Sequence, residues 1–409
     1  MLPSLARRPT HRFRSRSALL RAFSTAAAPQ GGTLYMCGTG EYNKLGVSDT
    51  KDREVPVAVE GLEDVEIIQV SCGKYHTAAL SASGDVFAWG LESSGQLGLG
   101  SARTKAPVPT KVDALSQMKV KSLSCGLYHT LALTDEGEVW SVGYGGSFFS
   151  GAGALGHGNR AQLDTPAKLS AFGDAGDAGV RAASVSAGGY HSIVQDVNGG
   201  VWSFGRGEWG RLGHSDSADL LQPQRIEECD HMGAVVSAFA ADAHSACLAA
   251  DGTVFTWGRN EHWQLGYEVA GLLNSGQSFD AQQEPAPVPM PAEAAKAVKL
   301  AVGEMGCVSL LEDQSIWMWG MARYFIPTRL PVGEVQIGAK IVDVQMGASH
   351  VILLTEDGSL YSFGTGAPLC LPKVERKPWQ LAPVPSVYLN ERRVLNVSCG
   401  AYSTALILE

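Results

Sequence analysis

The sequence lacks several features that would each point to a particular class of protein. It has no uninterrupted run of about eighteen apolar residues, which excludes an ordinary membrane-spanning helix. Its eight cysteines include no Cys-x-x-Cys pair, so the spacing of a structural zinc site or of a thioredoxin-like redox motif is missing. We therefore predict neither a metal, nor a cofactor, nor a transmembrane span.

Acidic residues are absent from the start of the chain, where the first one is Glu41. Residues 1–30, MLPSLARRPTHRFRSRSALLRAFSTAAAPQ, are rich in arginine, serine and alanine and contain no lysine. This composition is typical of a mitochondrial transit peptide, and Arg21 followed by Phe23 and small residues predicts cleavage after Phe23. A plastid transit peptide and a basic nucleic-acid-binding arm are the alternatives. We expect the protein in the mitochondrial matrix, with or without association with the inner membrane.

Basic residues are outnumbered in the rest of the chain. Loss of residues 1–23 would leave 26 basic residues against 41 acidic ones. An acidic field opposes non-specific binding to a phosphate backbone, so direct nucleic-acid binding is not expected. The short basic runs at Lys373 to Lys377 and at Arg392 and Arg393 are interpreted as solvated loop charge.

Glycine, by contrast, is abundant at 48 residues in a chain of 409, and it marks an internal repeat. The motif VSCGKYHTAAL at Val70, which we call the first word of the repeat, occurs in seven copies. Its seventh position is occupied in chain order by His76, His129, His191, His244, Gly306, His350 and Ser403. Successive copies are 44 to 62 residues apart. A long period of this kind indicates a propeller or a solenoid.

Two further words follow the first one in a fixed order. Six copies are followed by a short strand word such as GDVFAWG or GTVFTWG, each preceded by a tight turn such as ASGD or ADGT. A third word, exemplified by GQLGLG at Gly95, is missing or degraded in the last two units. Its glycines would let the chain turn sharply and pack close to the neighbouring unit.

The two ends of the chain complete the count. The seventh copy stops at Glu409 without its second strand, while GGTLYMCGTGEYNKLG, from Gly31, is a second strand with no first word before it. Strands from both termini in one blade would close a ring and remove its exposed edges. We predict an all-β protein, a closed seven-bladed β-propeller over residues 31–409 with one blade completed by strands from both termini, and we expect it to be monomeric.

The three words resemble the regulator-of-chromosome-condensation repeat family over about residues 31–409. The resemblance implies the seven-bladed propeller already predicted from the count. The functions that it implies are diverse, and include nucleotide exchange on the small GTPase Ran, ultraviolet sensing, ubiquitin-ligase domains and mitochondrial roles in ribosome assembly or with dynamin-type GTPases. Fold membership alone does not select among them.

The residues narrow this list. The ultraviolet receptor carries tryptophans in its repeats, whereas the matching positions here are Tyr75, Tyr128, Tyr190, Ala243, Met305, Ser349 and Tyr402. Together with the predicted transit peptide, this favours a resemblance to the mitochondrial members.

The repeated glycines and histidines are candidates for a structural role. An active centre usually breaks a repeat instead of following it, so we interpret equivalent histidines as hydrogen-bonding blade residues, not as catalytic residues or metal ligands. These predicted structural residues are Gly73, His76, Gly126, His129, Gly188, His191, His244, Gly347 and His350. No catalytic constellation stands out, and we predict that the protein is not an enzyme.

Units that depart from the repeat are the candidates for partner binding, because binding residues concentrate on loops held by a rigid scaffold. The insertion GYGGSFFSGAG from Gly143, the long connection from Gly266 to Pro289 and the segment from Met321 to Gly333 all depart from it. The candidate partner-binding residues are Tyr42, Phe148, Phe149, Trp209, Trp263, Tyr324 and Phe325. The alternative is that these loop aromatics pack against the adjacent blade.

Two functional hypotheses follow. The first is a non-catalytic mitochondrial protein-interaction platform, acting in assembly of the mitochondrial ribosome or of another organellar complex. The second is a guanine-nucleotide exchange factor for a mitochondrial small or dynamin-type GTPase, for which no loop or acidic wedge can be identified in the sequence.

Overall fold

The computed structural model describes residues 30–100, 105–147, 151–173, 179–269, 281–333 and 335–409. The predicted transit peptide, residues 1–30, lies outside the described residues except for Gln30.

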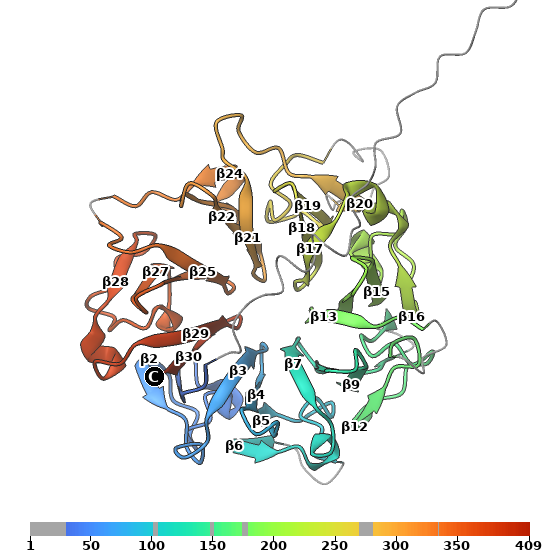
Figure 1. Ribbon diagram of the computed structural model, residues 1–409, viewed down its shortest axis with the longest axis horizontal. Coiled ribbons are helices and arrows are strands. Elements are labelled where there is room, and N and C mark those ends of the chain that lie inside the picture. The colour runs from blue at the N-terminus through green and yellow to red at the C-terminus, as the bar shows by residue number, and fades with distance from the viewer. Residues whose placement is uncertain (1–29, 101–104, 148–150, 174–178, 270–280, 334) are drawn as a thin grey trace, which may run out of the picture.

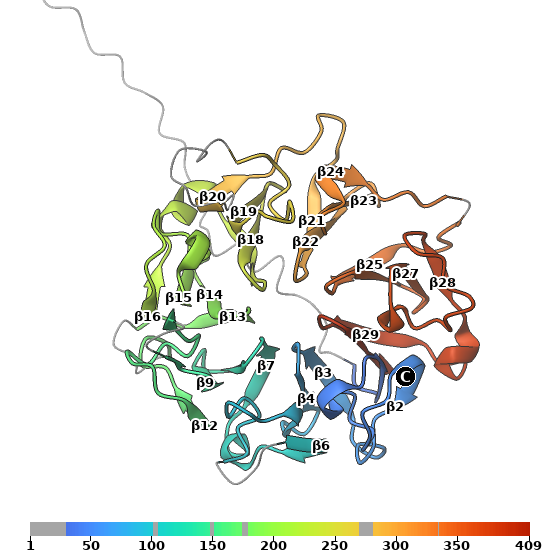
Figure 2. The ribbon, with the colours of Figure 1, turned by 180° about the vertical axis from the view of Figure 1, so that it is seen from behind.

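Seven four-stranded antiparallel sheets surround a common axis like the blades of a propeller (Figure 1). In each blade the first strand of the repeat lies nearest the axis and the last lies at the rim, as the view from behind also shows (Figure 2). The prediction of an all-β, seven-bladed propeller is confirmed.

The blades are numbered here in the order of the repeated word, and their strands run from the axis to the rim. Blade 1 has β3 (Ile67–Cys72), β4 (His76–Ser81), β5 (Val86–Leu91) and β6 (Lys105–Lys111); blade 2 has β7 (Val120–Cys125), β8 (His129–Thr134), β9 (Val139–Gly143) and β12 (Leu163–Lys168); blade 3 has β13 (Ala182–Ala187), β14 (His191–Asp196), β15 (Val201–Gly205) and β16 (Leu220–Arg225); blade 4 has β17 (Val235–Ala240), β18 (His244–Ala249), β19 (Val254–Arg259) and β20 (Ala281–Pro287). Blade 5 has β21 (Ala297–Val302), β22 (Gly306–Leu311), β23 (Ile316–Gly320) and β24 (Tyr324–Arg329); blade 6 has β25 (Ile341–Met346), β26 (His350–Thr355), β27 (Leu360–Gly364) and β28 (Ala382–Val384); blade 7 has β29 (Val394–Cys399), β30 (Ser403–Leu408), β1 (Thr33–Gly38) and β2 (Arg53–Ala58).

Short 3-10 turns lie in the connections between strands. They are η1 (Glu41–Asn43), η2 (Asp113–Leu115), η3 (Glu208–Gly210), η4 (Glu227–Met232), η5 (Ala367–Leu369) and η6 (Ser386–Leu389). In the described part of the chain, no helix has the length and apolar character needed to cross a bilayer. The predicted insertion from Gly143 differs from a simple loop, because β10 (Gly146–Ser147) and β11 (Gly151–Ala152) pair in it as a small hairpin.

Strands from both ends of the chain close the ring in blade 7, as predicted. β1 pairs antiparallel with β30 from Thr33 opposite Leu408 to Gly38 opposite Ser403. The closing strand β1 therefore has hydrogen-bonded neighbours on both sides, β30 and β2.

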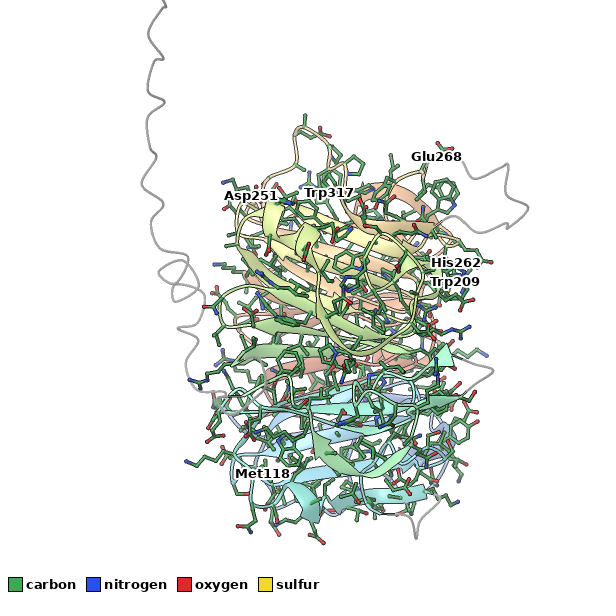
Figure 3. The ribbon with its side chains drawn as sticks, turned by 90° about the vertical axis from the view of Figure 1, so that its right-hand side faces the viewer. Met118, Trp209, Asp251, His262, Glu268 and Trp317 are labelled. Atoms are coloured by element: carbon green, nitrogen blue, oxygen red, sulfur yellow. The ribbon has the colours of Figure 1, made fainter. Side chains whose placement is uncertain are left out.

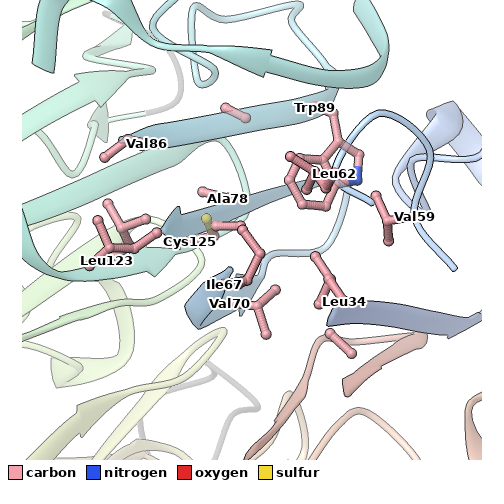
Figure 4. Packing of buried hydrophobic residues seen from close by; sticks show 14 of the residues in the cluster. Leu34, Val59, Leu62, Ile67, Val70, Ala78, Val86, Trp89, Leu123 and Cys125 are labelled. Atoms are coloured by element: carbon pink, nitrogen blue, oxygen red, sulfur yellow. The ribbon is translucent and has the colours of Figure 1, made fainter. Parts of the chain in front are cut away.

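The hydrophobic core fills the space between successive blades. Figure 4 shows Leu34 and Val59 of blade 7 near Ile67 and Trp89 of blade 1, all of them buried in one cluster. The Trp89 indole also donates a hydrogen bond of 2.9 Å to the carbonyl of Lys44 in blade 7. The Trp257 indole of blade 4 makes the same bond to the carbonyl of Arg211 in blade 3, at 3.0 Å.

The repeated histidines form a second link between blades, and this link has the same geometry at three successive junctions. His76 Nε2 lies 2.8 Å from Thr130 Oγ1 in the next blade, and Thr130 Oγ1 donates to the carbonyl of Gln96 in the first blade. The other links join His129 to Ser192, His191 to Ser245, His244 to the sulfur of Cys307 and His350 to Thr404.

The chemistry of these links fixes the state of the imidazoles. Because the hydroxyl of Thr130 donates to a carbonyl, it accepts from an Nε2–H group of His76. All five imidazoles are buried, and burial lowers the pKa of His76, His129, His244 and His350 to about 3 and that of His191 well below its usual value. They are neutral hydrogen-bonding groups inside the wall of the ring.

Glycines make a third contact between blades, close to the axis. A Cβ atom on Gly126 would lie 2.2 Å from the carbonyl oxygen of Gly188 in the next blade. The neighbouring Leu127 N–H donates to that same oxygen at 3.1 Å. A side chain at Gly126 would therefore push two blades apart, which explains why glycine recurs there.

Two junctions lack the histidine, and the structure explains one of them fully. At the junction of blades 5 and 6, a Cβ on Gly306 would lie 3.0 Å from the terminal methyl of Met346. Met346 stands at the end of its inner strand, where Cys72, Cys125 and Ala187 are smaller. The longer side chain packs against the position that histidine occupies elsewhere. At the junction of blades 7 and 1, Ser403 replaces the histidine and Thr77 still donates to the Lys44 carbonyl.

Replacement of His191 by alanine should destabilise the ring, because it removes a buried side chain and a hydrogen bond to Ser245. The expected loss is about 3 kcal/mol, measurable as a lower midpoint of thermal or urea unfolding. Cys307→Ser is the matched control, since a hydroxyl already accepts from the histidine at four other junctions, and its midpoint should be unchanged or higher. An unchanged midpoint in His191→Ala would contradict the structural role.

The neutral histidines also predict a fall in stability with acid. Unfolded histidine takes up a proton near pH 6.5, whereas the buried imidazoles do not until much lower pH, so stability is full above pH 6.5 and declines below it. Protonation of each of these histidines in the unfolded state lowers the free energy of unfolding by about 2 kcal/mol at pH 5. Glu92, whose pKa burial raises to about 7, titrates with the opposite sign and offsets about one of them. The Tm measured by calorimetry should fall between pH 7 and pH 5, and a constant or rising Tm would refute the assignment.

Candidate functional site

The two faces of the ring are built from different connections. The turns between the first and second strands and the loops between the third and fourth strands meet at one face, while the tight hairpins and the links between blades meet at the other. Figure 3 shows Trp209 and His262 at the first face and Asp251 and Met118 towards the second. The repeated glycine-to-histidine turn thus places its middle residues on the first face, around the axis.

A continuous arc of tyrosine rings covers part of this first face, and we call it the tyrosine arc: Tyr42, Tyr75, Tyr128, Tyr144 and Tyr190. The ring centroids are 5.2 Å apart between Tyr42 and Tyr75, 5.5 Å between Tyr75 and Tyr128, and 6.2 Å between Tyr128 and Tyr190. These are edge-on or tilted contacts of ordinary aromatic packing. The arc spans blades 7, 1, 2 and 3, and Tyr42 retains 39% of its exposure.

The sequence predicted only Tyr42 of this arc as a binding residue. Tyr75, Tyr128 and Tyr190 occupy equivalent positions in copies one to three, but nothing in a linear sequence shows that their rings touch across blade boundaries. The available signal was the loss of the aromatic in copies four to six, which makes the face asymmetric.

Charged residues bridge the mouth of the axial channel on the same face. Lys74 Nζ of blade 1 donates to Glu304 of blade 5 at 2.7 Å. Burial acts to lower the pKa of the Lys74 ammonium group. The hydrogen bond to Glu304 and the negative charge of Glu304 outweigh this effect, so the pKa of Lys74 is raised above its usual range. Below this pair lies a cavity of about 140 Å³, lined by turn residues such as Gly73 and Gly126. The ion pair is part of the lining of this cavity and crosses the channel on the side of the tyrosine arc.

A second charged group surrounds Trp209 in blade 3. The guanidinium carbons of Arg211 and Arg259 lie over the indole, at 4.7 and 4.4 Å from its ring centroid. Arg211 is buried, which lowers its pKa to about 10, and Glu208 lies 3.7 Å from it. Trp209 has φ 64°, a backbone conformation that a bulky side chain seldom adopts. Cation–π packing against Arg259 of the next blade holds the ring in place.

The other predicted aromatics lie around blades 4 and 5. Trp263, at φ 62°, packs on Phe325 with a centroid separation of 4.9 Å. Phe325 keeps 54% of its exposure, while Arg323 lies 5.7 Å from the Tyr324 ring and 4.9 Å from the Trp379 ring. Tyr42, Trp209 and Trp263 therefore all pack against the adjacent blade, as the alternative interpretation expected, and Tyr42 and Phe325 remain exposed as well.

Two predicted residues, Phe148 and Phe149, lie outside the described residues. The segment from Met321 to Gly333 does replace the Gly-Leu-Gly loop, because β23 and β24 are joined by a tight turn in which Met321 and Ala322 both have positive φ. This short turn leaves Phe325 uncovered at the rim of blade 5.

A larger cavity of about 830 Å³ opens along the axis towards the other face. The serine hydroxyls in its wall are used by the fold: Ser71 accepts from the Cys125 N–H and Ser124 accepts from the Ala187 N–H, each at 2.9 Å. Within the described ranges, no group of three or more histidine, cysteine, aspartate or glutamate side chains is arranged to hold a metal ion. The tyrosine arc is the stronger candidate site.

Comparison with known proteins identifies families and relatives that this chain resembles. The family model described as RCC1-like domain matches residues 21–326, and that of the regulator of chromosome condensation (RCC1) repeat matches residues 341–367. The human E3 ubiquitin-protein ligase HERC2 is 30% identical over 357 residues, which are 83% of this chain and 7% of the ligase. The mitochondrial RCC1 domain-containing protein RUG3 of Arabidopsis thaliana is 27% identical over 345 residues, 79% of this chain and 72% of RUG3.

The ultraviolet-B receptor UVR8 of Arabidopsis thaliana is 28% identical over 298 residues, 73% of this chain and 62% of the receptor. This chain thus spans less than two thirds of the ligase and of the receptor. Among solved structures, yeast RCC1 (Prp20) bound to Kap60 has a TM-score of 0.80 at 18% identity and covers 100% of this chain and 96% of its own. Human WBSCR16 has a TM-score of 0.75 at 22% identity, and the match covers 92% of this chain and 100% of the WBSCR16 chain.

The structural likenesses independently support the propeller fold. With a matching family model over most of its length and the seven repeats closed into one ring, the chain belongs to the RCC1-like domain family.

Proposed function

We propose that this protein is a non-catalytic, mitochondrial protein-interaction platform that acts in assembly of the mitochondrial ribosome or of another organellar complex. The tyrosine arc is the observation that carries this proposal. Its rings lie on one face of a closed ring. Tyr75, Tyr128 and Tyr190 directly precede histidines that are buried and already used by the fold. Aromatic residues held in this way are common anchors of protein interfaces.

The asymmetry of the face supports a directional docking surface. Blades 7, 1, 2 and 3 contribute tyrosines, while Asp242 and Glu304 stand at the matching turns of blades 4 and 5. A partner that lies across the mouth would meet aromatic surface on one side, and on the other Asp242 and the ion pair of Lys74 with Glu304. The yeast protein Prp20, whose fold is similar, has been described in a complex with Kap60 and for its binding to Gsp1p and histones.

The mitochondrial part of the proposal has separate support. The arginine-rich, acid-free first thirty residues favour import, and the relative RUG3 is named as mitochondrial. A fluorescent fusion of the full chain should colocalise with a matrix marker. A fusion found only in the nucleus or cytosol would overturn the location and leave the docking surface to be tested on its own.

Partner recovery tests the docking surface. The double variant Tyr75→Ala and Tyr128→Ala should lower the yield of co-purified mitochondrial proteins about tenfold, because two adjacent anchors are lost. Val387→Ala is the control, since Val387 is 62% exposed on the connection between β28 and β29, at the other face. Quantitative mass spectrometry after affinity purification gives the readout. Equal recovery by a folded double variant and wild type would refute the surface.

A second candidate function is guanine-nucleotide exchange on a mitochondrial small or dynamin-type GTPase. The similarity to Prp20 over the whole ring favours it, because that protein binds Gsp1p. The purified propeller should then accelerate release of labelled GDP from a mitochondrial GTPase by at least tenfold. Unchanged release, together with loss of partners in the tyrosine variant, would support the platform alone.

A further inference from the structure

Two cysteine sulfurs meet at the junction where the N-terminal strand closes the ring. Cys37 on β1 of blade 7 and Cys370, just after η5 of blade 6, have their Sγ atoms 2.8 Å apart. Both side chains are fully buried, and 333 positions separate them in the chain. They are among eight cysteines that are all free thiols in this structure.

The repeat shows that this pair replaces an aromatic contact. Cys37 lies opposite Thr404 in the β1–β30 ladder, just as Trp89 lies opposite Thr77 in blade 1. Trp89 and Thr77 both donate to the carbonyl of Lys44.

The corresponding groups at the cysteine junction use another carbonyl. Thr404 donates to the carbonyl of Pro368 at 2.8 Å, and the Cys37 thiol lies 3.8 Å from the same oxygen. Cys370 supplies the second sulfur from a loop that has lost its Gly-Leu-Gly word. Two departures from the repeat, one in each blade, thus meet at one point.

We propose that Cys37 and Cys370 are a redox-sensitive pair that forms a disulfide across this junction and fixes the closing strand covalently. A disulfide has a sulfur separation of about 2.05 Å, so the two atoms need only a small further approach. The bond would tie β1 to blade 6 directly, in addition to its hydrogen bonds with β30 inside blade 7.

The reaction requires an oxidant that accepts two electrons and two protons, and a diazene such as diamide is a suitable probe. One thiolate adds to a nitrogen of the N=N bond and forms a sulfur–nitrogen bond. The second thiolate attacks that sulfur, the sulfur–sulfur bond forms and the sulfur–nitrogen bond breaks. The hydrazine product carries both electrons and both thiol protons.

Burial makes the pair slow to react while the ring is closed. Burial and the neighbouring Cys37 raise the pKa of Cys370 well above its usual value, so little thiolate is present. Oxidation therefore proceeds through local opening of β1. The disulfide, once formed, opposes that same opening.

The test uses the full chain, reduced, freed of reductant and then treated with diamide. Remaining thiols are blocked with N-ethylmaleimide before digestion and mass spectrometry. The expected result is a cross-linked peptide containing Cys37 and Cys370, with a rise in Tm of about 5 °C that dithiothreitol reverses.

Three variants make the outcome decisive. Cys37→Ala and Cys370→Ala should each lose both the cross-link and the rise in Tm, while their reduced forms show a cooperative transition. Cys307→Ser should keep both, since Cys307 lies at another junction and contacts His244. Wild-type Cys37 and Cys370 that are both recovered blocked by maleimide, or a rise in Tm that persists in both alanine variants, would overturn the proposal.

Discussion

The hydrogen bond from a neutral histidine to a hydroxyl of the next blade is the interaction on which this ring depends. It joins two blades and a loop at once, because the hydroxyl that accepts from His76 also donates to the carbonyl of Gln96. A charged imidazole could not be buried there without a large desolvation cost. Histidine in the same turn therefore links five pairs of neighbouring blades. Each link requires a neutral imidazole.

Departures from this link show how the ring accommodates change. Gly306 and Met346 change together, one losing and the other gaining volume at a single junction. At the junction of blades 6 and 7, Cys37 and Cys370 stand where an indole would pack, while Thr404 keeps its bond to a loop carbonyl. At these junctions, residues of two neighbouring blades thus change together, and the four-stranded sheets keep the same arrangement. Function is free to differ on the exposed residues of the same turns.

The sequence predicted the architecture well because every blade repeats the same local words. Glycine, histidine and the aromatic strand fixed the number of blades, and the incomplete seventh copy predicted closure by both termini. The sequence also predicted a hydrogen-bonding role for His76 and His191, and in the structure each lies within hydrogen-bond distance of a hydroxyl of the next blade. The partners were beyond reach, since Thr130 and Ser245 lie 54 positions away and become neighbours only when the blades are placed around an axis.

The candidate site was predicted less completely for the same reason. Tyr42, Trp209 and Trp263 were identified from their loops, and the structure shows that each packs on the following blade. The contact of Tyr75 with Tyr128 depends on radial placement, as does the reach of Lys74 across the mouth to Glu304. The sequence shows which residues recur from blade to blade. The candidate docking surface, in contrast, is made by residues that differ between neighbouring blades.

The most direct test of this account is nuclear magnetic resonance of the imidazole nitrogens in the folded protein, recorded from pH 7 to pH 5. The account predicts that the five repeat histidines stay neutral with the proton on Nε2 throughout this range, because each donates to the next blade and none reaches solvent. Ordinary titration of these imidazoles near pH 6.5, or a proton on Nδ1, would contradict it.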